Sequence, residues 1–353
     1  MKKAKAFLQR KNINVSLQRY GIDALGAMAQ GLFASLLMGT ILKTIGQQFD
    51  WEIFITIGNF ATQVTGPAMA VAIGLALQAP ALVLFSLAAV GQAANTLAGA
   101  GGPLAVLIIT IFAAEAGKAI SKETKIDILL TPFITIVVGI LLAMWWAPSI
   151  GLAANAVGKT IMWATELQPF WMGILVSIIV GVALTLPISS AAICAALGLT
   201  GLAGGAALAG CCAQMIGFAV FSFKENKWNG IISQGLGTSM LQMGNIVKKP
   251  KIWIPIILIS AINGPVSTCI FRIHMNGAPV ASGMGTCGLV GPIGVYTGWI
   301  SDIAANTKTA ITAFDWIGMV IVCALLPAFL AIIASIFCRK TGFITEGDLT
   351  LPD

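Results

Sequence analysis

Apolar runs of about 20 residues recur along most of the chain, separated by short polar or glycine-rich stretches. A helix needs a run of that length to cross the hydrocarbon of a bilayer. The pattern therefore predicts an all-α polytopic membrane protein with about eight full transmembrane helices and two broken or re-entrant hairpins. The predicted crossings cover residues 21–45, 53–77, 81–97, 103–120, 126–146, 169–190, 252–271 and 316–337.

Composition supports the same fold class. Hydrophobic residues make up 58% of the chain, charged residues only 9%, and the mean hydropathy is +0.93. About a quarter of the residues in soluble domains are charged, so a soluble fold is excluded. The net charge of +7 comes from basic residues at the edges of apolar runs, which the positive-inside rule explains. We therefore expect no nucleic-acid partner, a bacterial plasma-membrane location, and both termini in the cytoplasm.

The chain divides into four predicted parts. Residues 1–20 form a basic amphipathic leader that touches membrane lipid on the cytoplasmic side. Residues 21–168 form a transmembrane scaffold, whose tryptophan-rich end at 147–168 is expected along the outer surface. Residues 169–338 form the C-terminal transmembrane part, with hairpins at 191–223 and 263–299 and an interfacial or re-entrant segment at 229–247. Residues 339–353 form a cytoplasmic tail.

The hairpin at 263–299 is the least regular stretch of the chain. It contains three prolines, seven glycines between Gly277 and Gly298, and the only histidine, His274. Glycine and proline weaken or break helices, and broken backbone survives in hydrocarbon only when it is buried in protein or lines a watery cavity. Transporters place their substrates at such discontinuous helices. The stretch is therefore a candidate ligand pathway.

His274 and Arg272 are the leading candidates for ligand binding. Ionisable groups within a membrane are costly and usually face a cavity or a partner. A histidine there can hydrogen-bond a sugar hydroxyl or accept its proton. The alternative is that both residues lie at the outer interface, where Arg272 simply extends its charge toward water. Asn263 and Asn276 bracket the histidine and join it as candidates.

Further candidates lie outside this group. Glu115 can accept hydrogen bonds from a ligand or pair with Lys118 on the same helix face, and we favour the pair. Thr238 and Thr286 can hydrogen-bond hydroxyl groups or satisfy open backbone. Glycines allow close backbone approach to a ligand at Gly283, Gly285, Gly288 and Gly291. These glycines are not a nucleotide-binding motif, because no strand precedes them.

The seven cysteines lie within or at the edge of apolar segments, and none has the spacing of metal ligands. Small buried hydrophobic roles are therefore expected for them. The sequence predicts no metal site and no cofactor.

Three motifs carry a family resemblance: GTSMLQMGN at 237–245, WIPIILISAINGP at 253–265 and GMGTCGLVG at 283–291. Together they resemble the IIC permease component of bacterial phosphotransferase systems, and more closely its perfringolysin regulator (PfoR)-like branch. The resemblance implies a helical permease, usually a homodimer, with a sugar held near re-entrant hairpins. It also implies separate IIA and IIB proteins that relay phosphate. The glutamate of the family's ITE motif has no counterpart in a membrane segment, since ITE occurs here only at Ile344–Glu346 in the tail.

Two functions follow as hypotheses. The first is a phosphotransferase permease that binds and translocates a sugar or related small polar solute and acts in phosphorylation only with separate IIA and IIB partners. The second is a PfoR-like membrane sensor or regulator that keeps the permease fold and acts through a cytoplasmic partner. Catalytic residues are not identified for either function.

Overall fold

The computed structural model describes residues 7–351, and their regular secondary structure is helical. In that range, six helical runs are long and apolar enough to cross a membrane: Arg19–Phe49, Ala81–Ile120, Asp127–Thr165, Gly201–Phe221, Pro250–Ile270 and Ala313–Lys340. Two shorter apolar helices, Thr65–Ala76 and Pro169–Thr185, accompany them. The predicted all-α polytopic membrane fold is confirmed. The chain forms two compact units, Met1–Ala153 and Ala154–Asp353, which we describe separately.

Unit 1 is a set of packed apolar helices. Its helices are α2 (Ala24–Leu32), α3 (Met38–Phe49), α4 (Glu52–Gln63), α5 (Thr65–Ala76), α6 (Ala81–Ala98), α7 (Gly102–Ile120) and the first part of α8 (Asp127–Thr165). A five-residue π-helical turn, Phe33–Leu37, joins α2 to α3 without a break. Helix α5 packs against α2, α6 and α7 and forms the centre of the unit.

Two predicted boundaries in this region differ from the structure. The expected crossing at 53–77 is two 12-residue helices, α4 and α5, because the backbone leaves helical geometry at Val64. The expected outer-surface segment at 147–168 is instead the continuation of α8, which runs for 39 residues to Thr165 with Pro148 inside it. Residues 147–165 therefore continue the preceding apolar helix without a break. Apolar side chains continue through this region, so helical periodicity persists past the tryptophans.

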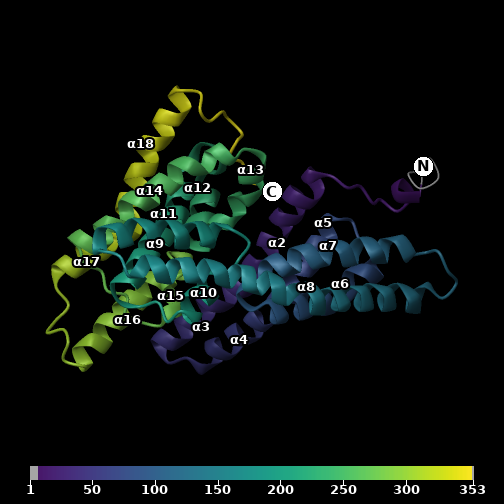
Figure 1. The fold of residues 1–353 in the computed structure, drawn as a ribbon, viewed down its shortest axis with the longest axis horizontal. Helices are drawn as coiled ribbons and strands as arrows, with labels where there is room; N and C mark the ends of the chain where they lie inside the picture. Colours follow the sequence, from purple (N-terminus) through teal and green to yellow (C-terminus); the bar gives the residue numbers. More distant parts are fainter. Residues whose placement is uncertain (1–6, 352–353) are drawn as a thin grey trace. The chain divides into compact units, whose positions relative to one another are not determined.

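Unit 2 contains longer and shorter helices. They are α9 (Pro169–Thr185), α10 (Ser190–Ala196), α11 (Gly201–Phe221), α12 (Phe223–Ile232), α13 (Met243–Lys248), α14 (Ile254–Pro265), α15 (Pro279–Ser282), α16 (Val290–Ala304), α17 (Ala313–Val320) and α18 (Leu326–Lys340). Helix α11 packs against α9, α14 and α18, and these helices lie alongside one another in Figure 1.

Small residues let the central helices of unit 2 approach closely. A Cβ atom added at Gly210 of α11 would lie 1.9 Å from the backbone oxygen of Ser177 in α9. One added at Gly264 of α14 would lie 2.0 Å from the backbone oxygen of Gly173 in α9. Membrane helices associate through such small-residue contacts, because lipid gives no hydrophobic drive between apolar surfaces.

The glycine-rich stretch at 191–223 also differs from the prediction. The sequence predicts a hairpin here and not a single crossing. In the structure the seven-residue α10 and a short turn lead into α11, a continuous helix of 21 residues that is long enough to cross a membrane. The glycines are tolerated within α11 because its surface is almost entirely covered by neighbouring helices.

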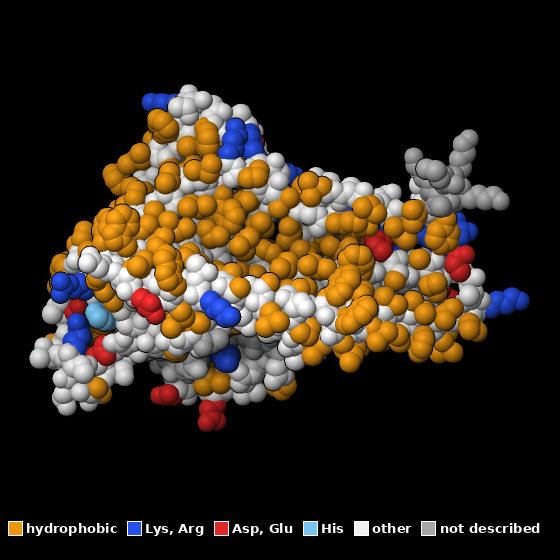
Figure 2. Space-filling model, viewed as in Figure 1, with side chains coloured by type: hydrophobic (Ala, Val, Ile, Leu, Met, Phe, Trp, Pro, Cys, Tyr) orange, Lys and Arg blue, Asp and Glu red, His pale blue; other side chains and the backbone are white. Residues whose placement is uncertain are grey.

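The surface matches a membrane environment. Hydrophobic side chains cover a broad area of the face shown in Figure 2, and the charged side chains on it are few and scattered. Large apolar residues such as Phe133, Trp145 and Leu152 are more than half exposed. Exposed apolar surface of this extent is expected where helices contact lipid.

Candidate functional site

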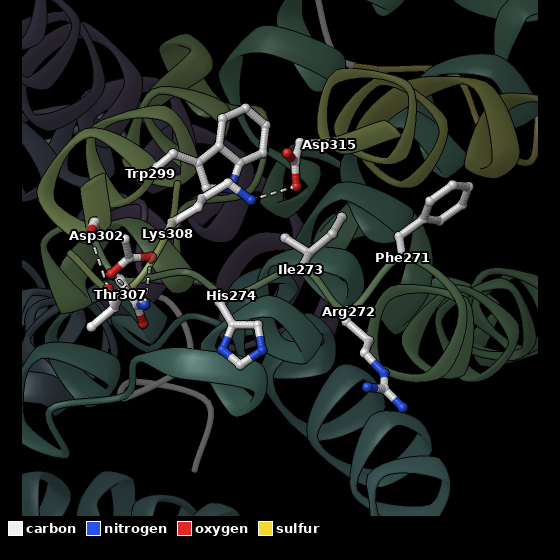
Figure 3. Close-up of a pocket in the computed structure, with 10 residues that line it drawn as sticks. Phe271, Arg272, Ile273, His274, Trp299, Asp302, Thr307, Lys308 and Asp315 are labelled. Atoms are coloured by element: carbon white, nitrogen blue, oxygen red, sulfur yellow. Dashed lines mark hydrogen bonds and ion pairs between the residues drawn. The ribbon is translucent and has the colours of Figure 1, made fainter. Parts of the chain in front are cut away.

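The segment 271–276 follows the helical run Pro250–Ile270 and leaves helical geometry, with a left-handed φ of 48° at Arg272. Ile273 and Met275 point into the protein and are buried, whereas Arg272 and His274 are exposed. Figure 3 shows the Arg272 and His274 side chains on the same side of this segment. The two leading candidates are therefore neighbours on an accessible surface.

Asn276 fixes this segment to two helices. Its Oδ1 accepts a hydrogen bond from the backbone N–H of Gly201, at the start of α11, at 3.1 Å. Its Nδ2 donates to both carboxylate oxygens of Asp302, in α16, at 3.0 and 2.9 Å. A backbone bridge between Gly201 and Met275 holds the same point. The segment is thus positioned by contacts at its end.

A cavity of about 390 Å³ lies beside this segment. It is formed by the segment, the end of α16, the following loop and the start of α17. Pockets for small ligands commonly measure about 300–1,000 Å³, so the cavity is large enough for a small molecule. Its lining residues are Phe271, Arg272, Ile273, His274, Asn276, Trp299, Asp302, Thr307, Lys308 and Asp315.

The charges that line the cavity balance each other. Arg272 and Lys308 are positive, and Asp302 and Asp315 are negative. Lys308 Nζ lies 2.8 Å from Asp315 Oδ1, an ion pair drawn in Figure 3, and 6.0 Å from the centre of the Trp299 ring. Four of the ten lining residues are charged in a chain with only 9% charged residues. Such a cavity favours a neutral polar ligand over an ion.

The start of α17 holds Asp315 in place. The Thr312 hydroxyl accepts a hydrogen bond from the Asp315 N–H at 3.3 Å, and Asp315 Oδ2 accepts one from the Thr312 N–H at 2.7 Å. This capping box satisfies backbone donors at the start of the helix. One carboxylate oxygen is used in the cap, so the other is directed toward Lys308.

Asn263 lies elsewhere. It is fully buried in α14 and does not line the cavity. Its Nδ2 donates to the backbone oxygens of Ala209 in α11 and Val322 at 2.8 and 2.9 Å, and its Oδ1 has no hydrogen-bond partner. Asn263 therefore joins three helical segments.

Thr238 and Thr286 are also outside the cavity. The Thr238 hydroxyl accepts a hydrogen bond from the Met240 N–H at 3.2 Å. The Thr286 hydroxyl donates to the backbone oxygen of Gly235 at 2.5 Å. Both threonines are buried and bond to backbone groups, which is the alternative that the sequence left open for them.

The four candidate glycines lie around the turn between α15 and α16. A Cβ atom at Gly283 would lie 2.6 Å from the backbone oxygen of Ser190 in α10, and one at Gly291 would lie 2.2 Å from that of Gly285. Gly285 and Gly288 have φ values of 56° and 50°, which residues other than glycine rarely adopt. These glycines shape contacts within the protein, and none lines the cavity.

Glu115 belongs to unit 1 and pairs within it. Its Oε2 lies 2.9 Å from Lys118 Nζ, and its Oε1 accepts a hydrogen bond from the Tyr20 hydroxyl at 3.0 Å. Lys118 also donates to the backbone oxygens of Asn12 and Leu77 at 2.7 and 3.1 Å. The carboxylate therefore balances the charge of a buried lysine, which is the Glu115–Lys118 pair that the sequence favoured.

Sequence reasoning missed seven of the ten lining residues, among them the three charged residues Asp302, Lys308 and Asp315. A signal for three of them was present. Asp302 and Asp315 are the only acidic residues between Glu225 and Glu346, and Lys308 is the only lysine or arginine between Arg272 and Arg339. Isolated charges in such an apolar region are usually paired or functional.

Comparison with known families gives one match. The family described as phosphotransferase system, EIIC, matches residues 22–351. Searches of curated proteins and of solved structures returned no match.

Proposed function

Because this chain belongs to the EIIC family of the phosphotransferase system, we propose that it binds a sugar in the cavity beside residues 271–276. The family makes the chain a membrane sugar-transport subunit. Its activity requires separate IIA and IIB proteins, which relay phosphate in these systems. The chain itself supplies the membrane passage and the sugar site.

The observation that supports this site most strongly is the combination of Trp299, Asp302 and His274 around one cavity. A tryptophan ring offers an apolar face and a polar edge, which suits the mixed surface of a sugar ring. Carboxylate oxygens accept hydrogen bonds from hydroxyl groups, and a neutral imidazole can donate or accept one. Balanced charge around them adds no preference for an ionic ligand.

The cavity lies at one end of two apolar runs. Run Pro250–Ile270 ends beside it, and run Ala313–Lys340 begins beside it. A helix of 21 residues spans about 30 Å, the thickness of the hydrocarbon. The opposite ends of these runs carry Lys248, Lys249, Lys251, Arg339 and Lys340. The positive-inside rule supports a cytoplasmic position for those lysines and arginines, an outward-facing cavity and a cytoplasmic C-terminus.

A thermal-shift screen of the detergent-purified protein against sugars, sugar alcohols and small organic acids tests the proposal. A ligand that binds the folded state raises its melting temperature. We expect one sugar class to raise the melting temperature of the wild type but not of His274→Ala. Lys159→Ala, an exposed lysine outside the cavity, is the control. An equal shift in His274→Ala would place the sugar elsewhere.

A second candidate function is a sensor or regulator that acts through a cytoplasmic partner. The observation that favours it is the docked C-terminal tail. Ile344 and Leu349 are buried, and the Leu349 backbone oxygen accepts hydrogen bonds from Asn226 and Gln242 at 2.8 and 2.9 Å. A tail attached by several polar contacts can change position when a ligand binds elsewhere in the unit, and a partner can read that change.

Reconstitution distinguishes the two functions. Vesicles that hold the protein are loaded inside with phosphorylated IIB, which gives its phosphoryl group to the sugar, and a sugar that binds is added outside. If the protein is a permease, we expect sugar phosphate inside the vesicles. If the protein is a regulator, we expect it to bind the sugar and to change the access of protease to the tail, but no sugar phosphate should form. The homodimer expected from the family resemblance also remains a proposal, and crosslinking in the same vesicles tests it.

A further inference from the structure

A second cavity, also of about 390 Å³, lies in unit 1 where α5 and α7 end. It is formed by the first described residues of the chain, the α5–α6 loop and the loop after α7. Its lining is basic, with four cationic residues and one acidic residue. The lining residues are Arg10, Lys11, Asn12, Gln78, Pro80, Lys118, Ser121, Lys122 and Glu123.

Two of the four cations, Lys118 and Lys11, bond to backbone oxygens. Lys118 is almost fully buried and bonds to Glu115 and to the backbone oxygens of Asn12 and Leu77. Lys11 donates to the backbone oxygen of Ser121. These oxygens lie at or just beyond helix C-termini, where the helix dipole favours positive charge. Both lysines therefore offset the partial negative charge of these helix ends at the base of the cavity.

The rim retains an excess of positive charge. Glu123 Oε1 lies 2.7 Å from Arg10 Nη2 and 2.5 Å from Lys11 Nζ, so one carboxylate serves two cations. The hydrogen bond from Lys11 and the charge of Arg10 lower the pKa of Glu123, so it stays ionised at neutral pH. Lys122 adds a third cation at the rim, and it is exposed.

The shape of the cavity depends on three tight turns. Asn12, Gln78 and Lys122 have left-handed backbone, with φ values of 53°, 54° and 61°. Few residues other than glycine adopt this conformation, and it often occurs where structure is built around a ligand. The Asn12 and Gln78 side chains are hydrogen-bonded to each other, which joins two of the turns.

Exposed apolar side chains lie close in sequence to the residues of the basic rim. Val15, Leu17, Leu75 and Ile126 are 83%, 69%, 68% and 59% exposed. Each is within a few residues of a residue that lines the cavity. Side chains of this type contact acyl chains when a protein lies in a bilayer, whereas a free phosphate ester offers them no contact.

We propose that this cavity binds the phosphate headgroup of an anionic phospholipid, with Arg10 and Lys122 at the phosphate and the neighbouring apolar side chains against the acyl chains. Basic pockets at the membrane surface bind anionic headgroups in this way. A soluble phosphate shares the headgroup chemistry, but the apolar surroundings favour the lipid. The site is independent of the sugar cavity, which lies in unit 2.

Native mass spectrometry of the full-length protein in detergent tests the site. The protein is titrated with short-chain phosphatidylglycerol or phosphatidylcholine, and bound lipids are counted. We expect tighter binding of phosphatidylglycerol, and a loss of about tenfold in its affinity in the double variant Arg10→Ala/Lys122→Ala. Lys125→Ala is the matched control, because Lys125 is exposed in the same loop but does not line the cavity.

Three outcomes would overturn the proposal. The first is equal affinity for both lipids. The second is loss of phosphatidylglycerol in Lys125→Ala to the same extent as in the double variant, which would indicate general surface charge. The third is displacement of the bound lipid by an equal concentration of glycerol phosphate, which would assign the cavity to a soluble phosphate ester. Melting temperatures of all variants show whether each remains folded.

Discussion

The Nδ2 atom of Asn276 donates hydrogen bonds to both carboxylate oxygens of Asp302, at 3.0 and 2.9 Å. The same amide accepts a bond from the Gly201 N–H, so one side chain connects the cavity segment, α11 and α16. Both Asn276 and Asp302 line the cavity. The position of the Asp302 carboxylate in the cavity therefore depends on Asn276.

Substitution Asn276→Ala should destabilise the protein by about 1–3 kcal/mol, because it leaves the half-buried Asp302 carboxylate without its amide donor, whereas the Gly201 N–H keeps the Met275 oxygen. Thermal unfolding in detergent measures the change. Sugar affinity should fall as well, since Asp302 loses its orientation. Asn155→Ala, at an exposed asparagine of the same unit, serves as the control and should change neither property. Equal stability of the two variants would contradict this account of Asn276.

Substitution Arg272→Gly should separate stability from binding. Arg272 has a φ of 48°, and a left-handed backbone costs a non-glycine residue about 1 kcal/mol. Glycine removes that cost, so the melting temperature should stay level or rise while sugar affinity falls. Arg272→Ala is the matched variant, because it loses the guanidinium group but keeps the strain. A sugar affinity unchanged in both variants would remove Arg272 from the site.

Three of the residues singled out from the sequence, Arg272, His274 and Asn276, line this cavity, and its other lining residues were not singled out. Residues 271–276 and their exposed pair, Arg272 and His274, followed from glycine, proline and rare ionisable residues near one another. Asp302 was missed because its partner, Asn276, lies 26 positions away, and only the fold shows that the two meet. Sequence position alone does not reveal such long-range contacts.

Boundaries were predicted less well than the fold class. Hydropathy identified the apolar segments, since bilayer thickness fixes their length. It did not show that α8 continues past Trp146. It also did not show that α11 is a continuous helix although it contains five glycines. Glycine weakens an isolated helix, but packing against α9 and α14 compensates in α11.

Substitution Gly205→Ala should disturb the cavity segment. A Cβ atom there would lie 1.9 Å from the backbone oxygen of Ile273, which cannot move without shifting residues 272–276. We expect a lower melting temperature and weaker sugar binding. Gly217→Ala in the same helix is the control, because its nearest contact is the Ile256 side chain at 3.3 Å. If the melting temperature and sugar binding of Gly205→Ala match those of Gly217→Ala, the close approach of α11 to Ile273 does not constrain the cavity segment.

Substitution Glu115→Gln should destabilise unit 1 by about 1–3 kcal/mol, because it removes the charge that balances the buried Lys118. Sugar affinity of the folded fraction should not change, since Glu115 lies outside the sugar cavity. Thermal unfolding and equilibrium sugar binding measure the two effects. A selective loss of sugar affinity with normal stability would return Glu115 to the list of binding residues.

The C-terminal tail should detach in acid. Burial alone would raise the pKa of Asp348, but hydrogen bonds from Lys249 and Thr345 outweigh it and hold the pKa below its usual value. A lowered folded pKa stabilises the docked tail above the unfolded pKa of about 4, and this contribution is lost as pH falls through the folded pKa. Hydrogen exchange at residues 344–351 measures the release.

Two variants check the assignment of this acid response. Asp348→Asn should remove the pH dependence of hydrogen exchange in the tail. Glu346→Gln should retain it, because Glu346 is an exposed carboxylate of the same tail. A response that persists in Asp348→Asn would show that another group controls the docking of the tail.

The most direct test of the sugar cavity is covalent mapping with a photoreactive derivative of the sugar that the thermal-shift screen identifies. After irradiation, digestion and mass spectrometry locate the labelled peptides. We predict labelling within residues 271–276 and 299–315, with loss of the label when unmodified sugar is added in excess. Competed labelling confined to other parts of the chain would contradict the assignment of this cavity as the sugar site.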